Sequence, residues 1–280
     1  MGAVHVGLVT HPRSRFDADG TATRQAQDLA DALGRRGAGA GLLISDRDDY
    51  DPQKLPLGRA ELRRSARYQA DLEYRWRRYL ADGGGRPARS RLADEAVRIA
   101  MTAKRVAGAD RAAAVRLLNI DLSHLRVMDA AAAAEAAWTL VLEDDAQAAD
   151  VAACAASLAA VIDSVDDTPV QFVNLSESLP LDRLGVDGLL SESGLAGSPA
   201  GLVAALRPVT NTVCANLYRM SFLTEVAAGI RDRGLVPVAP IDWRVNEQIM
   251  RMWNEGTVDA HSCAWTRPGL FLQGSMHAAK

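Results

Sequence analysis

The sequence predicts an α/β fold: a single domain, residues 1–280, with a mainly parallel twisted sheet flanked by helices. Short apolar runs at residues 3–9, 40–45, 138–143 and 170–175 alternate with longer segments of helical character. This order is expected when helices cover a parallel sheet. A chain of 280 residues, 48% of them hydrophobic, is long enough to bury the core of such a domain.

The chain opens with a β-α-β unit of the kind that binds nucleotides. Residues 3–9 and 40–45 are the predicted strands, and residues 21–33 are the predicted helix between them. The loop after the first strand carries three side chains that can meet a nucleotide base or phosphate: His11, Arg13 and Arg15. A solvated turn is the alternative interpretation of this loop.

Residues 58–81 are predicted to form a long helix that is rich in arginine, with Tyr and Trp residues interleaved. Such a helix can face an anionic acceptor, a lipid-linked diphosphate or an anionic bilayer. Because Glu61, Asp71 and Glu73 are interspersed along it, a solvated basic face that packs its aromatic residues inward is the alternative.

Residues 138–145 form a short apolar strand that leads directly into three carboxylates, Glu143, Asp144 and Asp145. Near a sheet these acids repel one another and lose solvation, so we expect a divalent cation that prefers oxygen ligands to compensate them. Side chains alternate along a strand, which predicts that Glu143 and Asp145 share one face while Asp144 points away. An exposed acidic turn is the alternative.

The segment before this strand contains Ser123-His124-Leu125, predicted to begin a helix that continues through an Ala-rich stretch to Ala137. His124 can bind a donor, or Ser123 can cap the helix while His124 packs inside. The order of this element and Leu142-Glu143-Asp144-Asp145 resembles family 25 of the glycosyltransferases, which includes lipooligosaccharide galactosyltransferases and collagen glycosyltransferases. That family usually has a Gly-Cys pair shortly before its Ser-His, where this chain has residues 119–121, Asn-Ile-Asp.

The second half of the chain continues the alternation. A helix at 151–165, a strand at 170–175, a long loop at 176–200, a strand at 212–219 and a helix at 221–233 are predicted. A loop of that length suits a lid or a binding loop. The resemblance extends to Asp242, in a Pro-x-Asp element, and to the terminal Gln273 and Ser275, so it covers residues 115–277.

The resemblance implies a GT-A fold, with residues 1–145 as the nucleotide-sugar-binding half and residues 146–280 as the acceptor-side half. It also implies a metal-dependent, hexosyltransferase-like glycosyltransferase. Such an enzyme moves a sugar from a nucleoside-diphosphate sugar to a hydroxyl of a small-molecule, saccharide or lipid-linked acceptor, with inversion.

In that scheme Mn²⁺ or Mg²⁺ lies on Glu143 and Asp145, with His277 as a further ligand or His261 in its place. Asp144 and His124 join His11, Arg13 and Arg15 in binding the donor. Asp242 is the expected general base, and Glu247 is the second candidate. For Asp242, a helix N-cap is the alternative role.

Two other classes of protein remain open from the residues alone. A nucleotidyltransferase would use the same metal carboxylates, but residues 11–15 contain neither the Gly nor the Lys of a phosphate-binding loop. A non-catalytic nucleotide- or sugar-binding protein would need neither a base nor a metal.

Charge and composition restrict the partners and the compartment. The net charge of −3 argues against a general nucleic-acid binder. The chain shows no signal-peptide pattern and no apolar run near the roughly 18 residues of a membrane span, so we expect a cytoplasmic protein that can touch a membrane surface. Cys154, Cys214 and Cys263 are far apart and odd in number, which predicts no disulfide.

Overall fold

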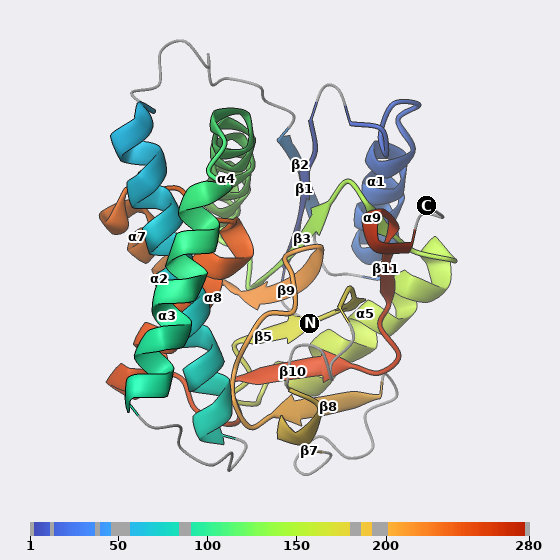
Figure 1. The fold of residues 1–280 in the computed structure, drawn as a ribbon. Helices are drawn as coiled ribbons and strands as arrows, with labels where there is room; N and C mark the ends of the chain where they lie inside the picture. The colour runs from blue at the N-terminus through green and yellow to red at the C-terminus, as the bar shows by residue number, and fades with distance from the viewer. Residues whose placement is uncertain are drawn as a thin grey trace.

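Helices cover both faces of one large sheet, so the α/β class that the sequence predicts is confirmed (Figure 1). The computed structural model describes residues 3–11, 14–36, 40–45, 57–83, 91–179, 186–191 and 201–277. Within these ranges the large sheet has eight strands, which lie side by side in the order β2 (Ala40–Ser45), β1 (Val4–Val9), β3 (Trp138–Glu143), β9 (Ala215–Arg219), β5 (Phe172–Asn174), β10 (Cys263–Thr266), β8 (Leu202–Ala205) and β7 (Leu190–Ser191). A three-stranded sheet joins β4 (Ala146–Gln147), β11 (Phe271–Gln273) and β6 (Ser176–Glu177).

The large sheet is mixed, so the prediction of a mainly parallel sheet is wrong. β1 pairs in parallel with β2 and β3, and β5 pairs in parallel with β10. β9 runs antiparallel to both β3 and β5, and β8 runs antiparallel to β10 and β7. An apolar run predicts a buried strand but carries no information about its direction, so the reversal at β9 was not predictable from the pattern.

The two faces of the sheet are covered by different helices. α1 (Thr21–Arg35) and α5 (Val151–Val165) pack on one face, together with Val4, Val6 and Leu8 of β1. α4 (Arg111–Ala133), α7 (Met220–Arg233) and α8 (Ile241–Glu255) pack on the other face, and α2 (Arg59–Gly83) and α3 (Arg91–Ala107) lie outside them (Figure 1). A 3₁₀ turn, Asp187–Leu189, and the short α9, Gly274–His277, complete the described elements.

Gly7 of β1 determines how closely α4 approaches the sheet. A Cβ atom built on Gly7 would lie 2.1 Å from Cγ1 of Val127 on α4, closer than two carbon atoms can pack. The lack of a side chain at Gly7 therefore lets α4 lie directly against β1.

Most predicted helices form within a few residues of their expected ends, but α4 differs. It is one continuous helix whose N-cap is Asp110, and the Asp110 carboxylate accepts a hydrogen bond of 2.7 Å from the N–H of Ala113. The predicted helix start at Ser123 is wrong, because Ser123 and His124 lie in the middle of α4 and are buried. Part of the predicted loop 176–200 is ordered as β6, the 3₁₀ turn and β7, and residues 180–185 and 192–200 lie outside the described residues.

A buried ion pair joins α4 to α8. Nε of Arg244 lies 2.9 Å from Oδ2 of Asp121, and the two side chains are 1% and 0% exposed. The Arg244 guanidinium also donates to the carbonyl oxygens of Gly234, Leu235 and Pro237 at 2.7–2.9 Å. These bonds fix the chain before α8 and compensate part of the desolvation of the Arg244 charge. Burial raises the pKa of the Asp121 carboxyl well above its ordinary value, against the attraction of the Arg244 charge.

All three cysteines are buried free thiols, in agreement with the prediction of no disulfide. Cys154 lies on α5, Cys214 directly precedes β9, and Cys263 begins β10. Burial raises the pKa of each thiol. Among the described residues, no helix combines the length and apolar character that a membrane crossing requires.

Asp121→Asn should destabilise the protein by about 3 to 5 kcal/mol, because it leaves the Arg244 charge buried without a counter-ion. The matched control is Glu255→Gln, which breaks the exposed pair between Arg251 and Glu255 on the same helix and should cost less than about 1 kcal/mol. Urea unfolding followed by circular dichroism measures both. Equal losses in the two variants would contradict the structural role assigned to the buried pair.

Candidate functional site

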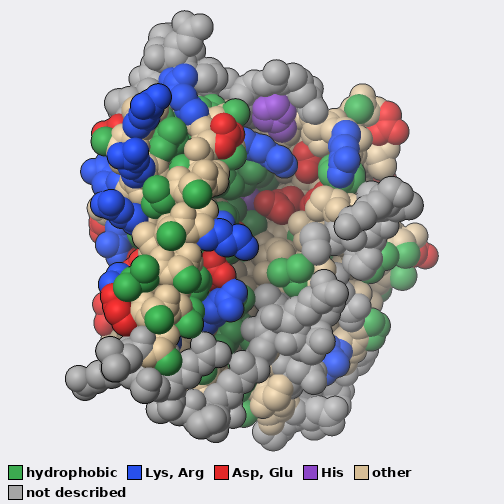
Figure 2. Space-filling view, in the orientation of Figure 1, with side chains coloured by type: hydrophobic (Ala, Val, Ile, Leu, Met, Phe, Trp, Pro, Cys, Tyr) green, Lys and Arg blue, Asp and Glu red, His purple; other side chains and the backbone are tan. Residues whose placement is uncertain are grey.

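A deep cleft lies at the point where the strand order of the sheet reverses. From β1 the chain continues to β2 on one side and later returns to β3 on the other side. Ligands of open α/β sheets bind in the crevice outside the carboxyl ends of such strands. A cleft of about 1360 Å³ occupies this place, and Figure 2 shows the hollow with acidic side chains in its depth and Lys or Arg side chains near its rim.

The walls of the cleft come from three parts of the chain. β1 and the loop after it contribute Val9, Thr10, His11, Ser14, Arg15 and Phe16. α4 contributes one face of its N-terminal half, with Arg111, Val115, Asn119 and Ser123 spaced four residues apart. The remaining wall is formed by the end of β3 and by Gln273 and Ser275 near the end of the chain.

All three acids that follow β3 line the cleft. The strand ends at Glu143, and Asp144 and Asp145 form a turn, so the strand alternation that predicted Asp144 to point away does not continue. Oδ2 of Asp144 accepts a hydrogen bond of 3.3 Å from the Thr10 hydroxyl. Burial raises the pKa of Asp144, and its two acidic neighbours add to this, while hydrogen bonds from the Ser14 and Thr10 hydroxyls oppose it.

Asp145 is the most deeply buried of the three acids, with 6% of its surface exposed. Its backbone carbonyl accepts from the N–H of Gly274 at 2.7 Å, and its Oδ2 accepts from the N–H of Ser275 at 3.3 Å. Its other carboxylate oxygen, Oδ1, is buried and has no hydrogen-bond partner among the described residues. A buried carboxylate oxygen without a partner is costly, and a bound cation or donor would relieve that cost.

His124 contacts an acid of the cleft from behind. Its Nε2 lies 3.2 Å from Oε1 of Glu143, and the ring is 1% exposed. The imidazole therefore holds the Glu143 carboxylate in place and is not itself part of the cleft lining. The sequence left two roles open for His124, and one of them was to bind the donor directly. Its buried position behind Glu143 does not favour that role.

Asp242 lies in the first turn of α8 and is not among the residues that line the cleft, but it is close enough to Glu143 for the two carboxylates to repel each other. The N-cap of α8 is Pro240, so the alternative role of Asp242 as the N-cap is wrong. Burial raises the pKa of Asp242 to about 7, and the repulsion from Glu143 is the second cause. The backbone N–H groups of Trp243 and Asp242 stabilise the charged carboxylate and lower the pKa, but their effect is smaller. A carboxyl group with this pKa exchanges its proton near neutral pH.

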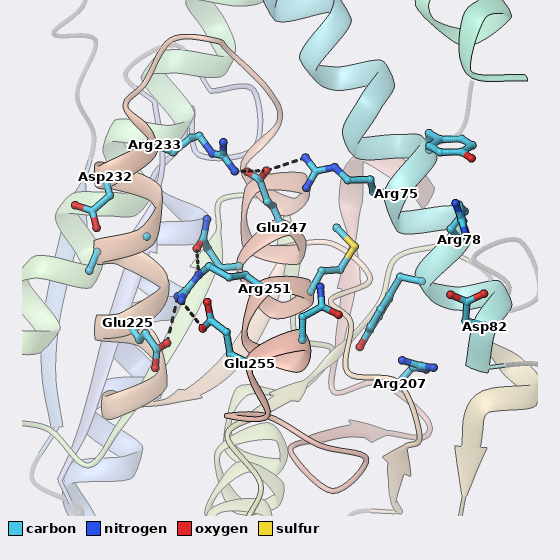
Figure 3. A pocket seen from close by; sticks show the side chains of 17 residues that line it. Arg75, Arg78, Asp82, Arg207, Glu225, Asp232, Arg233, Glu247, Arg251 and Glu255 are labelled. Carbon is cyan, nitrogen blue, oxygen red and sulfur yellow. Dashed lines mark hydrogen bonds and ion pairs between the residues drawn. The ribbon is translucent and has the colours of Figure 1, made fainter. Parts of the chain in front are cut away.

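Glu247 lies elsewhere, in a second cavity of about 1030 Å³ between α2, α7 and α8 (Figure 3). Its carboxylate accepts hydrogen bonds from Arg75 at 2.8 Å, from Arg233 at 2.9 Å and from the Tyr68 hydroxyl. Arg251 in the same cavity is paired with Glu225 and Glu255. Because these charges are satisfied by one another, Glu247 has a structural ion-pair role, and the structure does not bring it to the acidic cleft.

The structure brings together several but not all of the other predicted site residues. His11 and Arg15 line the acidic cleft. Arg13 and the His277 side chain lie outside the described residues. His261 is exposed in the turn before β10 and does not line the cleft.

Across the part of the chain that the structure describes, no group of three or more His, Cys, Asp or Glu side chains is arranged to hold a metal ion by itself. Comparisons of the chain with protein-family models, with curated proteins and with solved structures find no match.

Sequence reasoning missed the wall that α4 contributes. Arg111, Arg116 and Asn119 line the cleft, although none of them was among the site residues that the sequence predicted. The polar residues at 111, 116, 119 and 123, which recur about every four positions, were the signal that could have revealed one continuous helix with a cleft-facing side.

Asp242→Asn should change stability in a pH-dependent way. The pKa of Asp242 is about 7 in the folded state and near its ordinary value of 3.8 when unfolded. The parent therefore loses stability as pH rises from about 4 to about 7, because only the unfolded state releases the proton readily in that range. The neutral Asn avoids this loss, so the variant should exceed the parent by about 2 to 4 kcal/mol at pH 8 and by much less at pH 4.5.

Thermal and urea unfolding at the two pH values measure this difference. Asp150→Asn is the control, because Asp150 is an exposed N-cap of α5 and Asn caps about as well as Asp. A stability difference for Asp242→Asn that is the same at both pH values would contradict the raised pKa.

Proposed function

We propose that this protein is a metal-dependent glycosyltransferase that moves a sugar from a nucleoside-diphosphate sugar to an acceptor hydroxyl. The observation that carries the proposal is the Asp145 carboxylate, whose Oδ1 is buried without a partner in a cleft at the switch point of the sheet. The resemblance of residues 122–145 to family 25 of the glycosyltransferases supports the same class. The cleft volume of about 1360 Å³ leaves room for a nucleotide with a sugar.

The residues at the end of β3 fit a divalent cation that is shared with a bound diphosphate. Mg²⁺ is usually held in proteins by one or two carboxylates together with substrate phosphates and water, so it does not need a cage of three protein ligands. The unpartnered Oδ1 of Asp145 and the nearby Glu143 and Asp144 provide carboxylate oxygens of this kind. When bound, Mn²⁺ or Mg²⁺ would neutralise the charge that develops on the leaving diphosphate.

Two other parts of the cleft wall provide positive groups for the donor. Arg15 lies on the loop after β1, and Arg111 and Arg116 lie on the facing side of α4. One guanidinium group can bind two phosphate oxygens at once, and it remains charged at any physiological pH. With the acids on one side and these arginines on another, a diphosphate can be oriented with its charge compensated from both directions.

Asp242 is the proposed general base. In an inverting transfer, its carboxylate takes the proton of the acceptor hydroxyl while the hydroxyl oxygen forms the new bond to the anomeric carbon and the diphosphate leaves from the opposite face. A pKa of about 7 suits this proton transfer at neutral pH. His124 acts as a positioning residue, because it contacts Glu143 from the interior.

Asp145→Asn should weaken the binding of a nucleoside diphosphate in the presence of Mn²⁺ by about 10- to 100-fold, the usual cost of losing a metal-orienting group. Binding in EDTA should not weaken, because without the metal the neutral side chain repels the diphosphate less than the carboxylate does. Calorimetric titration of UDP, GDP, CDP and dTDP measures both conditions, with Asp150→Asn as the control. If the parent binds each of these nucleotides equally well with and without Mn²⁺, the metal site is contradicted.

Asp242→Asn should lower kcat by about 10² to 10⁴ while donor affinity stays near that of the parent, because the substitution removes a proton acceptor and keeps the shape. Release of the nucleoside diphosphate in the presence of sugar acceptors measures the rate. A variant that transfers sugar at the parent rate would exclude Asp242 as the base. A parent that binds sugar nucleotides but never releases the diphosphate would indicate a binding protein.

A further inference from the structure

The N-terminal half of α2 presents four exposed arginines, Arg59, Arg63, Arg64 and Arg67, which we call the α2 arginine patch. Arg59, Arg63 and Arg67 follow one another at intervals of four residues, and Arg64 lies three residues before Arg67. Residues three and four apart are neighbours on the surface of a helix. The patch is therefore a continuous positive surface about two turns long.

The α2 arginine patch differs from several other helical arginines of the protein, which are held in ion pairs. Arg75 pairs with Asp71, Arg77 with Glu73 and Arg251 with Glu255, each pair four residues apart on one helix. Within the described ranges of the chain, none of the four patch arginines lies within ion-pair distance of a carboxylate. The four arginines are thus not held in ion pairs, although Glu61 lies three residues before Arg64 and Asp71 lies four residues after Arg67.

This arrangement is unfavourable for the isolated protein. Like charges four residues apart destabilise a helix slightly, and positive charge near a helix N-terminus opposes the helix dipole. Figure 2 shows Lys and Arg side chains gathered along the upper left edge of the molecule, on the side where α2 lies in Figure 1. An external anionic surface that covers the patch would remove both penalties.

The helix that carries the patch is linked to the acidic cleft through α4. Leu57 and Leu62, at the beginning of α2, pack against Ala114, Val115 and Leu118 of α4. Val115 belongs at the same time to the wall of the cleft. A surface that binds the α2 arginine patch would therefore lie close to the cleft.

We propose that the α2 arginine patch docks the protein on an anionic lipid bilayer. A local cluster of at least four basic residues on a helix is sufficient for such binding, and each contributes independently near the membrane surface. The guanidinium group of arginine can also donate two parallel hydrogen bonds to the phosphate oxygens of a lipid headgroup. The proposal does not depend on the chemistry of the cleft; under the proposed function, docking would bring the cleft to an acceptor carried by a lipid.

Single-stranded nucleic acid is the competing polyanion, and two observations favour the bilayer. The protein has a net charge of −3, whereas nucleic-acid-binding domains normally carry a clear basic excess. Binding of unpaired bases also uses exposed aromatic rings, yet the aromatic residues of α2 turn inward, with Tyr68 bonded to Glu247 and Tyr79 bonded to the Pro208 carbonyl.

The test is sedimentation of the full-length protein with vesicles of phosphatidylcholine, with or without phosphatidylglycerol. We expect binding only to the vesicles that contain phosphatidylglycerol, and weaker binding as salt rises, because exposed charges are screened. Replacing all four patch arginines by Gln should lower the partition coefficient by about 10² to 10³, since each arginine near an anionic surface contributes about fivefold. Gln is chosen because it is almost as favourable as Arg in a helix.

The matched control removes the same number of charges far from the patch, with Gln at Arg24, Arg35, Arg36 and Arg267, which are exposed on α1 or after β10. This variant should bind the anionic vesicles nearly as well as the parent. Equal losses in the two variants would show that overall charge, and not the patch, is responsible, and would overturn the proposal. It would also be overturned if the parent did not bind the anionic vesicles, or if it bound a single-stranded oligonucleotide more tightly than it bound them.

Discussion

The buried ion pair between Asp121 and Arg244 sets the relative position of the two helices on which the candidate site depends. His124 follows Asp121 by three residues on α4, and Asp242 precedes Arg244 by two residues on α8. Both His124 and Asp242 interact with Glu143 at the end of β3. A single buried pair thus places an imidazole and a second carboxyl group around one acid of the cleft. Burying two charges costs solvation free energy, so the arrangement is maintained only because Arg244 also bonds three backbone carbonyls.

The parts of the fold that sequence could predict are those encoded in short stretches of the chain. β1, β2 and β3 are continuous apolar runs, and burial of both faces of the sheet requires such runs. The direction of β9 depends on which strands it meets, and those partners are distant in the chain. The sequence also did not predict that α4 continues through residues 119–121. Asp121 is compensated inside this buried helix by Arg244, which lies more than a hundred residues later in the chain.

In the candidate site, too, the features encoded in short stretches of the chain were predictable, and the features that depend on distant residues were not. The three acids after β3 and the loop after β1 meet in one cleft because the carboxyl ends of neighbouring parallel strands lie at one edge of the sheet. Glu247 was expected near Asp242 because only five residues separate them, but an α-helix turns by about 100° per residue, so positions five apart face different directions. It therefore lies among Arg75, Arg233 and Tyr68 on another side of α8.

The three buried cysteines give the protein its own reporters of transient opening. Only the thiolate reacts with alkylating reagents, and both the burial and the raised pKa of Cys154, Cys214 and Cys263 suppress that form in the native state. Each thiol belongs to a different region: the helical layer, the chain beside the acidic cleft, and the far side of the sheet. The N–H of Glu143 donates to the carbonyl oxygen of Cys214 at 2.8 Å, so labelling of Cys214 requires motion next to the acids. The relative labelling rates of the three thiols thus record which region of the native ensemble opens first, without any engineered probe.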